Sequence, residues 1–211
     1  MDKKTQIVLA SSNAGKIREL KELFTPLDLE LISQTELGVS DIEETGSTFI
    51  ENALLKARHA AQQTGLPALA DDSGLVVAAL AGAPGIYSAR YAGSPTNDQS
   101  NNEKLLLAMR DVPQEKRQAF FYCVLVFLTH ADDPTPLVCD GKWSGSILFA
   151  PQGGFGFGYN PVFYVPTENA SAAEIPSHKK NQLSHRGLAL QSLLKLLPDK
   201  LNECAFRTKS Y

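Results

Sequence analysis

Residues 6–24, QIVLASSNAGKIRELKELF, decide the fold class of this chain. Residues 6–11 form a short apolar run of the kind that makes a buried strand. From residue 16 to residue 24 the period changes, and the pattern predicts a helix with charged residues on one face. Its other face carries Ile17, Leu20, Leu23 and Phe24. Residues 29–32 predict a second strand, so the first part of the chain is expected to be a β-α-β unit.

A second helix is indicated further along by its end groups. Thr48 and Glu51 match a capping box, in which side chains and backbone N–H groups bond reciprocally, so we expect a helix to begin near Thr48. It should end at residues 64–67, TGLP, since Gly followed by Pro is a frequent helix terminus. Residues 67–72 and 75–80 are then predicted to be two short strands.

The rest of the chain mixes strands and helices. Residues 101–109 predict a short helix, and residues 119–130, AFFYCVLVFLTH, predict a long strand rich in aromatic and β-branched side chains. Residues 137–147 are expected to be its neighbour, with a turn at residues 132–136 between them. A final helix is predicted over residues 187–197. Hairpin-like strands beside a β-α-β unit favour an α/β fold with a mixed sheet and flanking helices.

Composition bounds the possible functions. The chain has 211 residues, of which 43% are hydrophobic and 20% charged, typical of a globular protein with one large domain or a domain with two lobes. No linker divides it, so we predict one domain over residues 1–211. The net charge of −3 argues against nucleic-acid binding through a broad basic surface. The longest apolar run, residues 119–128, is too short to span a bilayer.

Targeting and cysteine patterns favour the cytoplasm. Residues 1–5, MDKKT, lead straight into the first strand and contain no apolar run of signal-peptide type. Cys123, Cys139 and Cys204 are scattered and odd in number, with no CxxC or zinc-binding spacing. We therefore expect reduced thiols and a cytoplasmic location without membrane attachment.

The loop between the first strand and helix, residues 11–16 (SSNAGK), is a candidate anion site. Backbone N–H groups and the positive end of the helix dipole meet where the helix begins, and Lys16 adds a full charge. The segment is not a Walker A loop, because Ala10 and Ile17 stand where that motif has Gly and Ser or Thr. The loop alone leaves two interpretations open: a phosphate site, or an ordinary N-cap turn with a solvated lysine.

Two acidic segments are candidates for metal chemistry. Residues 41–46, DIEETG, either form a solvated loop or supply carboxylate ligands to Mg²⁺, which favours a few hard oxygens together with substrate phosphates. The second segment, residues 69–75 (LADDSGL), places two adjacent aspartates between apolar runs. Ionised carboxylates are costly to bury unless something pairs with them, so this segment predicts a functional or paired site.

Strand geometry predicts that the two aspartates play unequal roles. Successive side chains of a strand point to opposite faces, so Asp71 and Asp72 share one site only if the strand ends or bulges at residues 73–74. We expect a strand end there, with Asp72 facing the site. Asp71 would then support the site through a water, a backbone N–H group or a neighbouring cation.

Four further segments carry candidates for ligand contacts. Lys56 lies on the second predicted helix, where it either faces a cleft or extends into water. Arg90 follows a turn-rich segment and suits phosphate, since a guanidinium matches phosphate geometry. Residues 153–161, GGFGFGYNP, either form a twisted hairpin or let a base approach the backbone and stack. His185 and Arg186 follow a serine N-cap, and two cations in a first helical turn favour a base-edge or phosphate contact there.

Taken together, these motifs closely resemble the inosine triphosphate pyrophosphatase family, and the resemblance covers residues 6–197. The motifs that carry it occur in order and at the expected spacing: SSNAGK, EETGSTFIENALLKA, ADDSG, GAPGIYSARYAG, GFGYNPVF and SHRG. The resemblance implies a two-lobed mixed α/β fold with a deep central cleft, and a homodimer. It also implies Mg²⁺-dependent hydrolysis of ITP, dITP and XTP to the monophosphate and pyrophosphate, which clears deaminated purines from the nucleotide pool.

By position, the resemblance assigns roles to individual residues. The triphosphate would be held by Ser11, Ser12, Asn13, Ala14, Gly15 and Lys16, with Lys56 and Arg90. The metal would be associated with Glu43 and Asp72, and Asp72 would also be the general base, with Ser73 beside it at the substrate. The base pocket would comprise Phe157, Gly158, Tyr159, Asn160, Lys180, His185 and Arg186.

One residue departs from the family pattern, and two rival functions remain. Asn160 stands where the family usually has Asp, and an amide both donates and accepts hydrogen bonds whereas an ionised carboxylate only accepts. Base selectivity is therefore the inherited property that this change affects most. The rivals are a nucleotide-binding regulator without turnover and a triphosphatase that releases orthophosphate.

Overall fold

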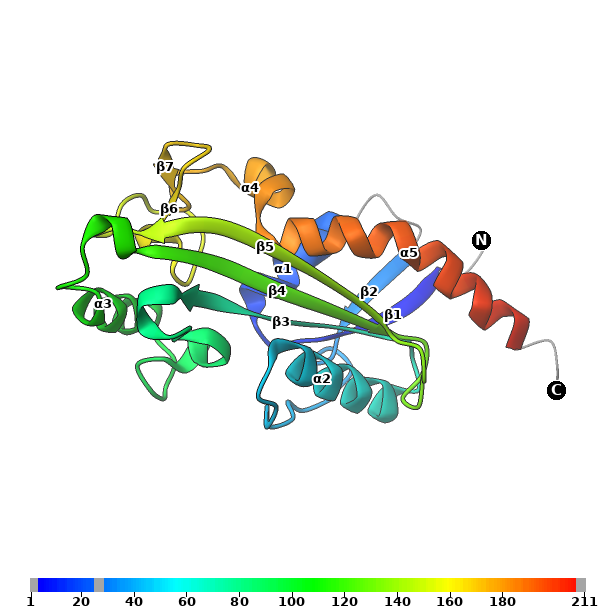
Figure 1. Ribbon diagram of the computed structural model, residues 1–211. Coiled ribbons are helices and arrows are strands. Elements are labelled where there is room, and N and C mark those ends of the chain that lie inside the picture. Colours follow the sequence, from blue (N-terminus) through cyan, green and yellow to red (C-terminus); the bar gives the residue numbers. More distant parts are fainter. Residues whose placement is uncertain (1–3, 25–28, 208–211) are drawn as a thin grey trace. The chain divides into compact units, whose positions relative to one another are not determined.

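The computed structural model describes residues 4–24 and 29–207, apart from the side chains of Leu23 and of residues 203–207. The described strands form one seven-stranded sheet in the order β2-β1-β3-β4-β5-β6-β7 (Figure 1). β1 pairs in parallel with β2 and β3, whereas β6 pairs antiparallel with β5 and β7, so the predicted mixed sheet is confirmed. The strands are β1 Thr5–Ala10, β2 Leu29–Ser33, β3 Ala68–Val77, β4 Gln118–Leu128, β5 Leu137–Ile147, β6 Phe163–Val165 and β7 Ala170–Ser171.

Helices flank the sheet, as predicted. The capping box is confirmed, because the Thr48 side chain accepts a hydrogen bond from the backbone N–H of Glu51 and the helix ends at Gly65, whose φ is 68°. The α-helices are α1 Ala14–Phe24, α2 Phe49–Thr64, α3 Asp98–Ala108, α4 Ser177–Leu183 and α5 His185–Arg207. Short 3₁₀ helices cover Ala78–Leu80, Gly85–Arg90, Gln114–Lys116 and Asn160–Val162.

The chain divides into two compact units. Unit 1 comprises Met1–Asp72, Val124–Asp140 and Ala189–Tyr211, and unit 2 comprises Ser73–Cys123 and Gly141–Leu188. The chain therefore passes from one unit to the other four times, within β3, β4, β5 and α5. The organisation of residues 1–211 as a single domain with a deep cleft stays a prediction.

The core of unit 1 lies where α2 packs on β1. Ile7, Val8 and Leu9 of β1 are fully buried, and so are Ala53 and Ala57 of α2. The small alanine side chains let the helix approach the strand closely. This packing fixes α2, and with it the lysine that the helix carries, against the end of the sheet where β1 leads into α1.

A buried ion pair holds α5 to the turn between β4 and β5. The Lys200 ammonium lies 3.2 Å from Asp133 and donates to the carbonyl oxygen of Thr135. The Asp133 carboxylate also accepts from the backbone N–H groups of Thr129 and Thr135 at 3.0 and 2.9 Å. Asp133 and Lys200 are 1% and 5% exposed, so the hydrogen bonds of this network take the place of hydrogen bonds to water at both charged groups.

The core of unit 2 is aromatic and is closed by a buried arginine. Phe121, Trp143 and Phe163 pack together, with ring centroids 4.6–6.2 Å apart. Arg117, only 1% exposed, donates to the carbonyl oxygens of Ile147 and Leu148 and of two residues that follow α3. Its guanidinium therefore satisfies carbonyl groups that would otherwise lack donors.

The prediction of two strands at residues 67–72 and 75–80 is wrong. The chain forms one strand, β3, from Ala68 to Val77, and residues 78–80 turn into a 3₁₀ helix. Residues 73–74 do not end the strand because β3 lies inside the sheet, between β1 and β4. The register with β1 covers Ala68–Ala70, so beyond it β4 is the neighbour beside which the backbone stays extended through Gly74, a glycine that would weaken an isolated strand.

The final helix is longer than predicted. α5 begins at His185 and passes through Pro198 to Arg207, whereas the sequence predicted an end at residue 197. Proline disfavours a helix interior, but the residues after it are anchored by the Lys200–Asp133 pair. The short α4, β6 and β7 were not predicted.

The structure describes two of the three cysteine side chains. Cys123 and Cys139 are buried. The side chain of Cys204 lies outside the described residues. Of the helices that the structure describes, none is long and apolar enough to cross a membrane.

Candidate functional site

The SSNAGK loop is built as a helix N-terminus. β1 ends at Ala10, and α1 begins at Ala14, two residues before its predicted start. The side-chain oxygen of Asn13 accepts from the backbone N–H of Lys16 at 3.1 Å, which makes Asn13 the N-cap. The Ser12 hydroxyl is exposed and donates to the Asp41 carboxylate at 2.7 Å, and this bond joins the loop to the acidic segment.

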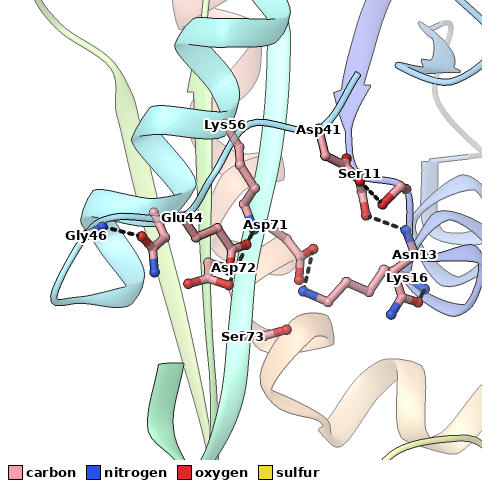
Figure 2. A network of polar contacts seen from close by, with 12 residues as sticks. Ser11, Asn13, Lys16, Asp41, Glu44, Gly46, Lys56, Asp71, Asp72 and Ser73 are labelled. Carbon is pink, nitrogen blue, oxygen red and sulfur yellow. Dashed lines mark hydrogen bonds and ion pairs between the residues drawn. The ribbon is translucent and has the colours of Figure 1, made fainter. Parts of the chain in front are cut away.

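Lys16 turns back from the loop toward the sheet. Its ammonium lies 3.1 Å from the Asp71 carboxylate, as Figure 2 shows. The Lys16 side chain is 15% exposed and that of Asp71 is fully buried. The interpretation of Lys16 as a solvated lysine is therefore wrong, and the neighbouring cation predicted for Asp71 is Lys16.

Lys56 is a second partly buried cation near the two aspartates of β3. Its ammonium lies 2.8 Å from Glu44 and 3.4 Å from Asp72 (Figure 2). Its side chain is 15% exposed, so it does not extend into water. Burial alone would lower the pKa of the Lys56 ammonium, but three neighbouring carboxylates outweigh burial and raise that pKa above its ordinary value. Lys56 is therefore held as a cation.

Asp71 and Asp72 serve different lysines, in line with the predicted unequal roles. They are consecutive residues of a continuous strand, so their side chains leave opposite faces of it. Asp71 contacts Lys16 and Asp72 contacts Lys56. The expected strand end is absent, and the alternation of the strand itself separates the two carboxylates.

Among the carboxyl groups around Lys16 and Lys56, that of Asp72 has a raised pKa. Burial raises the pKa of Asp72 above its ordinary value, and the ammonium groups of Lys56 and Lys16 offset only part of that effect. The nearby carboxylates of Glu44 and Asp71 raise it further. A carboxylate of raised pKa is a stronger base than an exposed aspartate, which suits it to accept a proton.

The acidic segment at residues 41–46 is fixed at both ends. Asp41 accepts from Ser12 at one end, and the N–H of Gly46 donates to the side-chain oxygen of Asn52 at 2.8 Å at the other. A Cβ atom at Gly46 would lie 2.6 Å from the Cβ of Glu51, so only glycine fits there. Within the segment Glu43 is exposed, whereas Glu44 reaches Lys56.

Sequence reasoning missed the role of Glu44. Glu43 was assigned to the metal by resemblance, but Glu44 and Asp72 are the two carboxylates that meet at one ammonium group. Alternation along the extended segment could have separated the two glutamates into opposite faces. It could not have shown which face meets α2.

The residues assigned to the base pocket belong to unit 2, and several of them converge on Gly156. A Cβ atom at Gly156 would lie 2.2 Å from the side-chain nitrogen of Asn160 and 2.9 Å from the Lys180 ammonium. The two side chains therefore pass directly over this glycine, whose φ is 91°. Residues 153–159, all of them described, form no strand, so the hairpin interpretation is wrong.

The neighbours of Asn160 differ in exposure. The Tyr159 ring is buried and its hydroxyl donates to the carbonyl oxygen of Ser88 at 2.7 Å, so Tyr159 joins two loops. Phe157 is half-buried and keeps part of its ring accessible. Arg90 ends the 3₁₀ helix of the other loop, with its guanidinium 5.3 Å from the Tyr87 ring centroid.

The start of α5 carries His185 and Arg186, two of the residues predicted to form the base pocket. The Ser184 hydroxyl accepts from the backbone N–H of Gly187 at 3.2 Å, so the predicted N-cap is confirmed. The His185 ring stacks on Phe121, with centroids 4.8 Å apart. The Arg186 guanidinium, 4% exposed, donates to the Ser73 hydroxyl at 3.1 Å.

Carboxylate oxygens near Lys56 are chemically suited to Mg²⁺. Glu44 and Asp72 offer hard oxygen atoms, and magnesium commonly takes one or two carboxylates together with substrate phosphates. Over residues 4–24 and 29–207 no group of three or more His, Cys, Asp or Glu side chains is arranged as a complete metal site.

Comparison with known proteins identifies the family. The Ham1 family model matches residues 7–196. A dITP/XTP pyrophosphatase of Salmonella typhimurium is 60% identical over 91% of this chain and 98% of its own length. One of Vibrio cholerae is 57% identical over 92% and 98%.

Solved structures agree with the sequence comparison. A HAM1 protein from Coxiella burnetii is 51% identical, with a TM-score of 0.86 over 92% of this chain and 99% of that one. A nucleoside-triphosphatase / dITP/XTP pyrophosphatase from Mycobacterium abscessus is 37% identical, with a TM-score of 0.70 over 94% and 97%. The resemblance seen in the sequence motifs is confirmed, and the chain belongs to the Ham1 family.

Proposed function

We propose that this chain is a pyrophosphatase of non-standard purine nucleoside triphosphates, which converts dITP, XTP and ITP to the monophosphate and pyrophosphate. Its curated relatives carry the name dITP/XTP pyrophosphatase. The observation that carries the proposal is the pair of partly buried lysines, each held against a carboxylate of β3. Cations suit a triphosphate, and the carboxylates beside them supply what hydrolysis needs in addition to binding.

Residues of unit 1 would hold the triphosphate and carry the reaction. The SSNAGK loop and Lys16 suit phosphate oxygens, since a helix N-terminus offers N–H groups and positive potential. Lys56 adds positive charge where the leaving pyrophosphate develops negative charge, and Arg90, a residue of unit 2, is the further cation that the family resemblance assigns to the triphosphate. No covalent nucleophile is needed, so positioning and electrostatic stabilisation account for catalysis.

Asp72 is proposed as the general base. It accepts a proton from a water molecule whose oxygen forms a bond to the α-phosphorus. The bond between that phosphorus and the bridging oxygen of the leaving group breaks, and pyrophosphate departs with the electron pair. Burial raises the pKa of Asp72, and this makes proton transfer to it more favourable.

Mg²⁺ is the proposed cofactor, associated with Asp72 and with the acidic segment. Glu43 is the ligand that the family resemblance assigns, and Glu44 is the glutamate that contacts the same lysine as Asp72. When bound, the ion would offset negative charge on the phosphates. Lys56 would keep the two carboxylates oriented until substrate and metal arrive.

Residues of unit 2 are proposed to hold the base. Arg186 and Lys180 donate hydrogen bonds and cannot accept them, so they suit the 6-keto group of hypoxanthine or xanthine and reject the 6-amino group of adenine. A donor left without a partner in a buried site costs on the order of 10⁴ in rate. Phe157 offers a ring face for stacking, and Ser73, Gly158, Tyr159, Asn160 and His185 complete the proposed pocket.

One assay tests the reaction. Purified protein with Mg²⁺ is incubated with ITP, dITP, XTP, GTP or ATP, and phosphate is measured with and without added inorganic pyrophosphatase. Phosphate from ITP, dITP and XTP only when the helper enzyme is present is the expected result. Phosphate without the helper means a triphosphatase releasing orthophosphate, and no phosphate from any nucleotide favours a regulator that binds without turnover.

The same panel repeated on Asn160→Asp tests base selectivity. A carboxylate there would pair with the Lys180 ammonium and could not donate to the base. We expect the ratios of kcat/KM among the nucleotides to change by roughly tenfold, as hydrogen bonds to charged groups do. The kcat for the best substrate should change less, since Asn160 belongs to the proposed base pocket. Unchanged ratios would remove Asn160 from the selectivity site.

The remaining properties are proposed from the family resemblance and composition. We propose a homodimer in the cytoplasm, where the nucleotide pool is, with no nucleic-acid or membrane partner. The residues 1–211 are proposed to act as one domain whose two lobes are units 1 and 2. Light scattering during size-exclusion chromatography tests the dimer, and a mass equal to one chain would contradict it.

A further inference from the structure

We propose that Asn102, assisted by Asp98, is a positioning residue for base recognition, because it fixes the backbone of Gly158 within the segment that holds the base. The inference rests on the proposed function only in that residues 157–160 contact the base. Neither Asp98 nor Asn102 was a candidate in the sequence.

The first turns of α3 contact Gly158 on both of its backbone polar groups. The Gly158 N–H donates to the Asp98 carboxylate at 2.7 Å, and the Gly158 carbonyl oxygen accepts from the Asn102 amide at 3.0 Å. Asp98 and Asn102 are four residues apart and share one face of the helix. The φ of Gly158 is 63°, a left-handed value, so the helix holds a conformation that glycine reaches without strain.

The next side chain of the same helix holds the neighbouring loop. The Asn101 side-chain oxygen accepts from the N–H of Ala92 at 2.7 Å, and its amide donates to the carbonyl of Ala89 at 3.0 Å. The Tyr159 hydroxyl bonds to Ser88 in that loop. One helix, α3, therefore binds both the segment around Arg90 and the segment around Gly158.

The burial of Asn102 indicates a role beyond filling space. The side chain is 8% exposed, and its carboxamide oxygen finds no hydrogen-bond partner in the described part of the chain. A buried polar atom without a partner is unfavourable. A leucine of similar size would avoid this loss, but it would leave the Gly158 carbonyl without its donor. The polar side chain therefore serves the Gly158 backbone at a local cost.

Asp98 makes the weaker of the two contacts. It is exposed, so water can replace part of its bond to Gly158. An asparagine at position 98 keeps an acceptor oxygen at the same place. Asp98→Asn is therefore the conservative variant, and Asp98→Ala removes the acceptor altogether.

Asn102→Ala and Asn102→Leu test the proposal in steady-state kinetics. We expect KM for dITP and XTP to rise roughly tenfold, the size expected for a partly buried hydrogen bond, while kcat changes by less than about threefold. Asp98→Ala should raise KM less, and Asp98→Asn should restore it. The control is Glu103→Gln on the same helix, because Glu103 is exposed and accepts a hydrogen bond from the Gln99 amide at the surface.

A second measurement separates positioning from general stability and from the reaction itself. Amide hydrogen exchange of residues 155–161 should be faster in Asn102→Ala than in wild type, with exchange in β1 and α2 unchanged. An unchanged KM and unchanged exchange overturn the proposal. A lower Tm with equal losses of kcat for every nucleotide and an unaltered KM overturns it too. If the wild-type protein turns over no nucleotide, the proposed function fails, and the exchange result alone decides whether Asn102 fixes Gly158.

Discussion

The two units organise their candidate residues by opposite means. In unit 1 the functional side chains are charged and hold one another, as Lys16 with Asp71 and Lys56 with Asp72 do. In unit 2 side chains hold backbone groups instead, as Asn102 does at Gly158 and Tyr159 does at Ser88. Charged pairs can exchange partners when a charged ligand arrives, whereas a backbone held by amides keeps its shape.

This difference predicts how each unit responds to substitution. Removing a charge in unit 1 leaves its partner buried without a counter-ion and alters the proposed chemistry. Removing a contact in unit 2 should loosen a preformed surface and weaken binding, with little effect on the chemical step. The predictions below run from the largest expected effect on turnover to the smallest.

Asp72→Asn should have the largest effect. Without its proposed general base the enzyme should lose roughly 10²- to 10⁴-fold in kcat, because an amide does not accept the proton from water. The affinity for a non-hydrolysable triphosphate should stay close to wild type. Single-turnover kinetics and equilibrium binding measure the two quantities.

Asp71→Asn is the matched control for that variant. Asp71 contacts Lys16 and is not assigned to the chemical step, so its loss should act mainly on KM. A wild-type kcat in Asp72→Asn would remove the assigned role of Asp72. Equal losses of kcat in the two variants would show that Asp71 and Asp72 do not have separate roles.

Lys56→Gln should come next. It removes the cation shared by Glu44 and Asp72, and we expect kcat/KM for dITP to fall roughly 10- to 100-fold, as loss of a charged hydrogen bond does. The control is Lys21→Gln, because Lys21 pairs with Glu36 at 2.9 Å on the exposed surface. A loss as small as that of Lys21→Gln would place Lys56 outside the phosphate site.

His185 tests whether a residue of unit 2 recognises the base or only completes the core. His185→Ala loses the stack on Phe121 and should destabilise the fold by about 2 kcal/mol. His185→Phe keeps the stack, so Tm should stay near wild type while KM rises roughly threefold to tenfold through one lost hydrogen bond. An unchanged KM in His185→Phe would assign the residue to packing alone.

The smallest effect on turnover is expected at Asp133, where the effect on stability is large. Asp133→Asn should leave kcat/KM unchanged and lower the free energy of unfolding by roughly 3–5 kcal/mol, because Lys200 keeps a buried charge. Urea unfolding measures this loss. Asp132→Asn, at an exposed neighbour, is the control and should change stability little.

The same pair predicts a pH dependence of stability. Burial alone would raise the pKa of Asp133, but hydrogen bonds from Thr129, Thr135 and Lys200 outweigh burial and lower that pKa below its ordinary value. In the unfolded chain the aspartate carboxyl titrates near its ordinary pKa of about 4. The stabilisation is complete above that pH and is lost as the pH falls toward the lower folded pKa. Wild type should therefore lose stability below about pH 4 more steeply than Asp133→Asn, and parallel curves would contradict this.

Much of the fold was predictable because local signals and burial agree. Thr48 and Glu51 cap α2 as their spacing predicts, and β5 has the bounds that its pattern gave. The continuity of β3 was not predictable from residues 73–74. It depends on neighbouring strands that lie far away in the sequence.

Individual residues of the candidate site were predictable from the sequence, but the ion pairs that they form were not. Local patterns marked Lys16 and the two aspartates of β3 as unusual. Only the folded chain shows that Glu44 rather than Glu43 meets Lys56, because the choice depends on where α2 packs. Asn102 gave no signal, since its partner is a backbone group in a loop distant along the chain.

Because β3 is uninterrupted, the position of a residue along the strand decides which face its side chain leaves. Odd and even residues face different lysines, so the assignment of Asp71 and Asp72 depends on the count of residues from the pairing with β1, where Ala10 lies beside Ala70. Deleting Ala70, with the pairing of Val8 and Leu9 to β3 kept, would exchange the two faces. Both carboxylates would remain in the sequence, but each would face the other lysine. A two-residue deletion would keep each carboxylate on its original face of the strand.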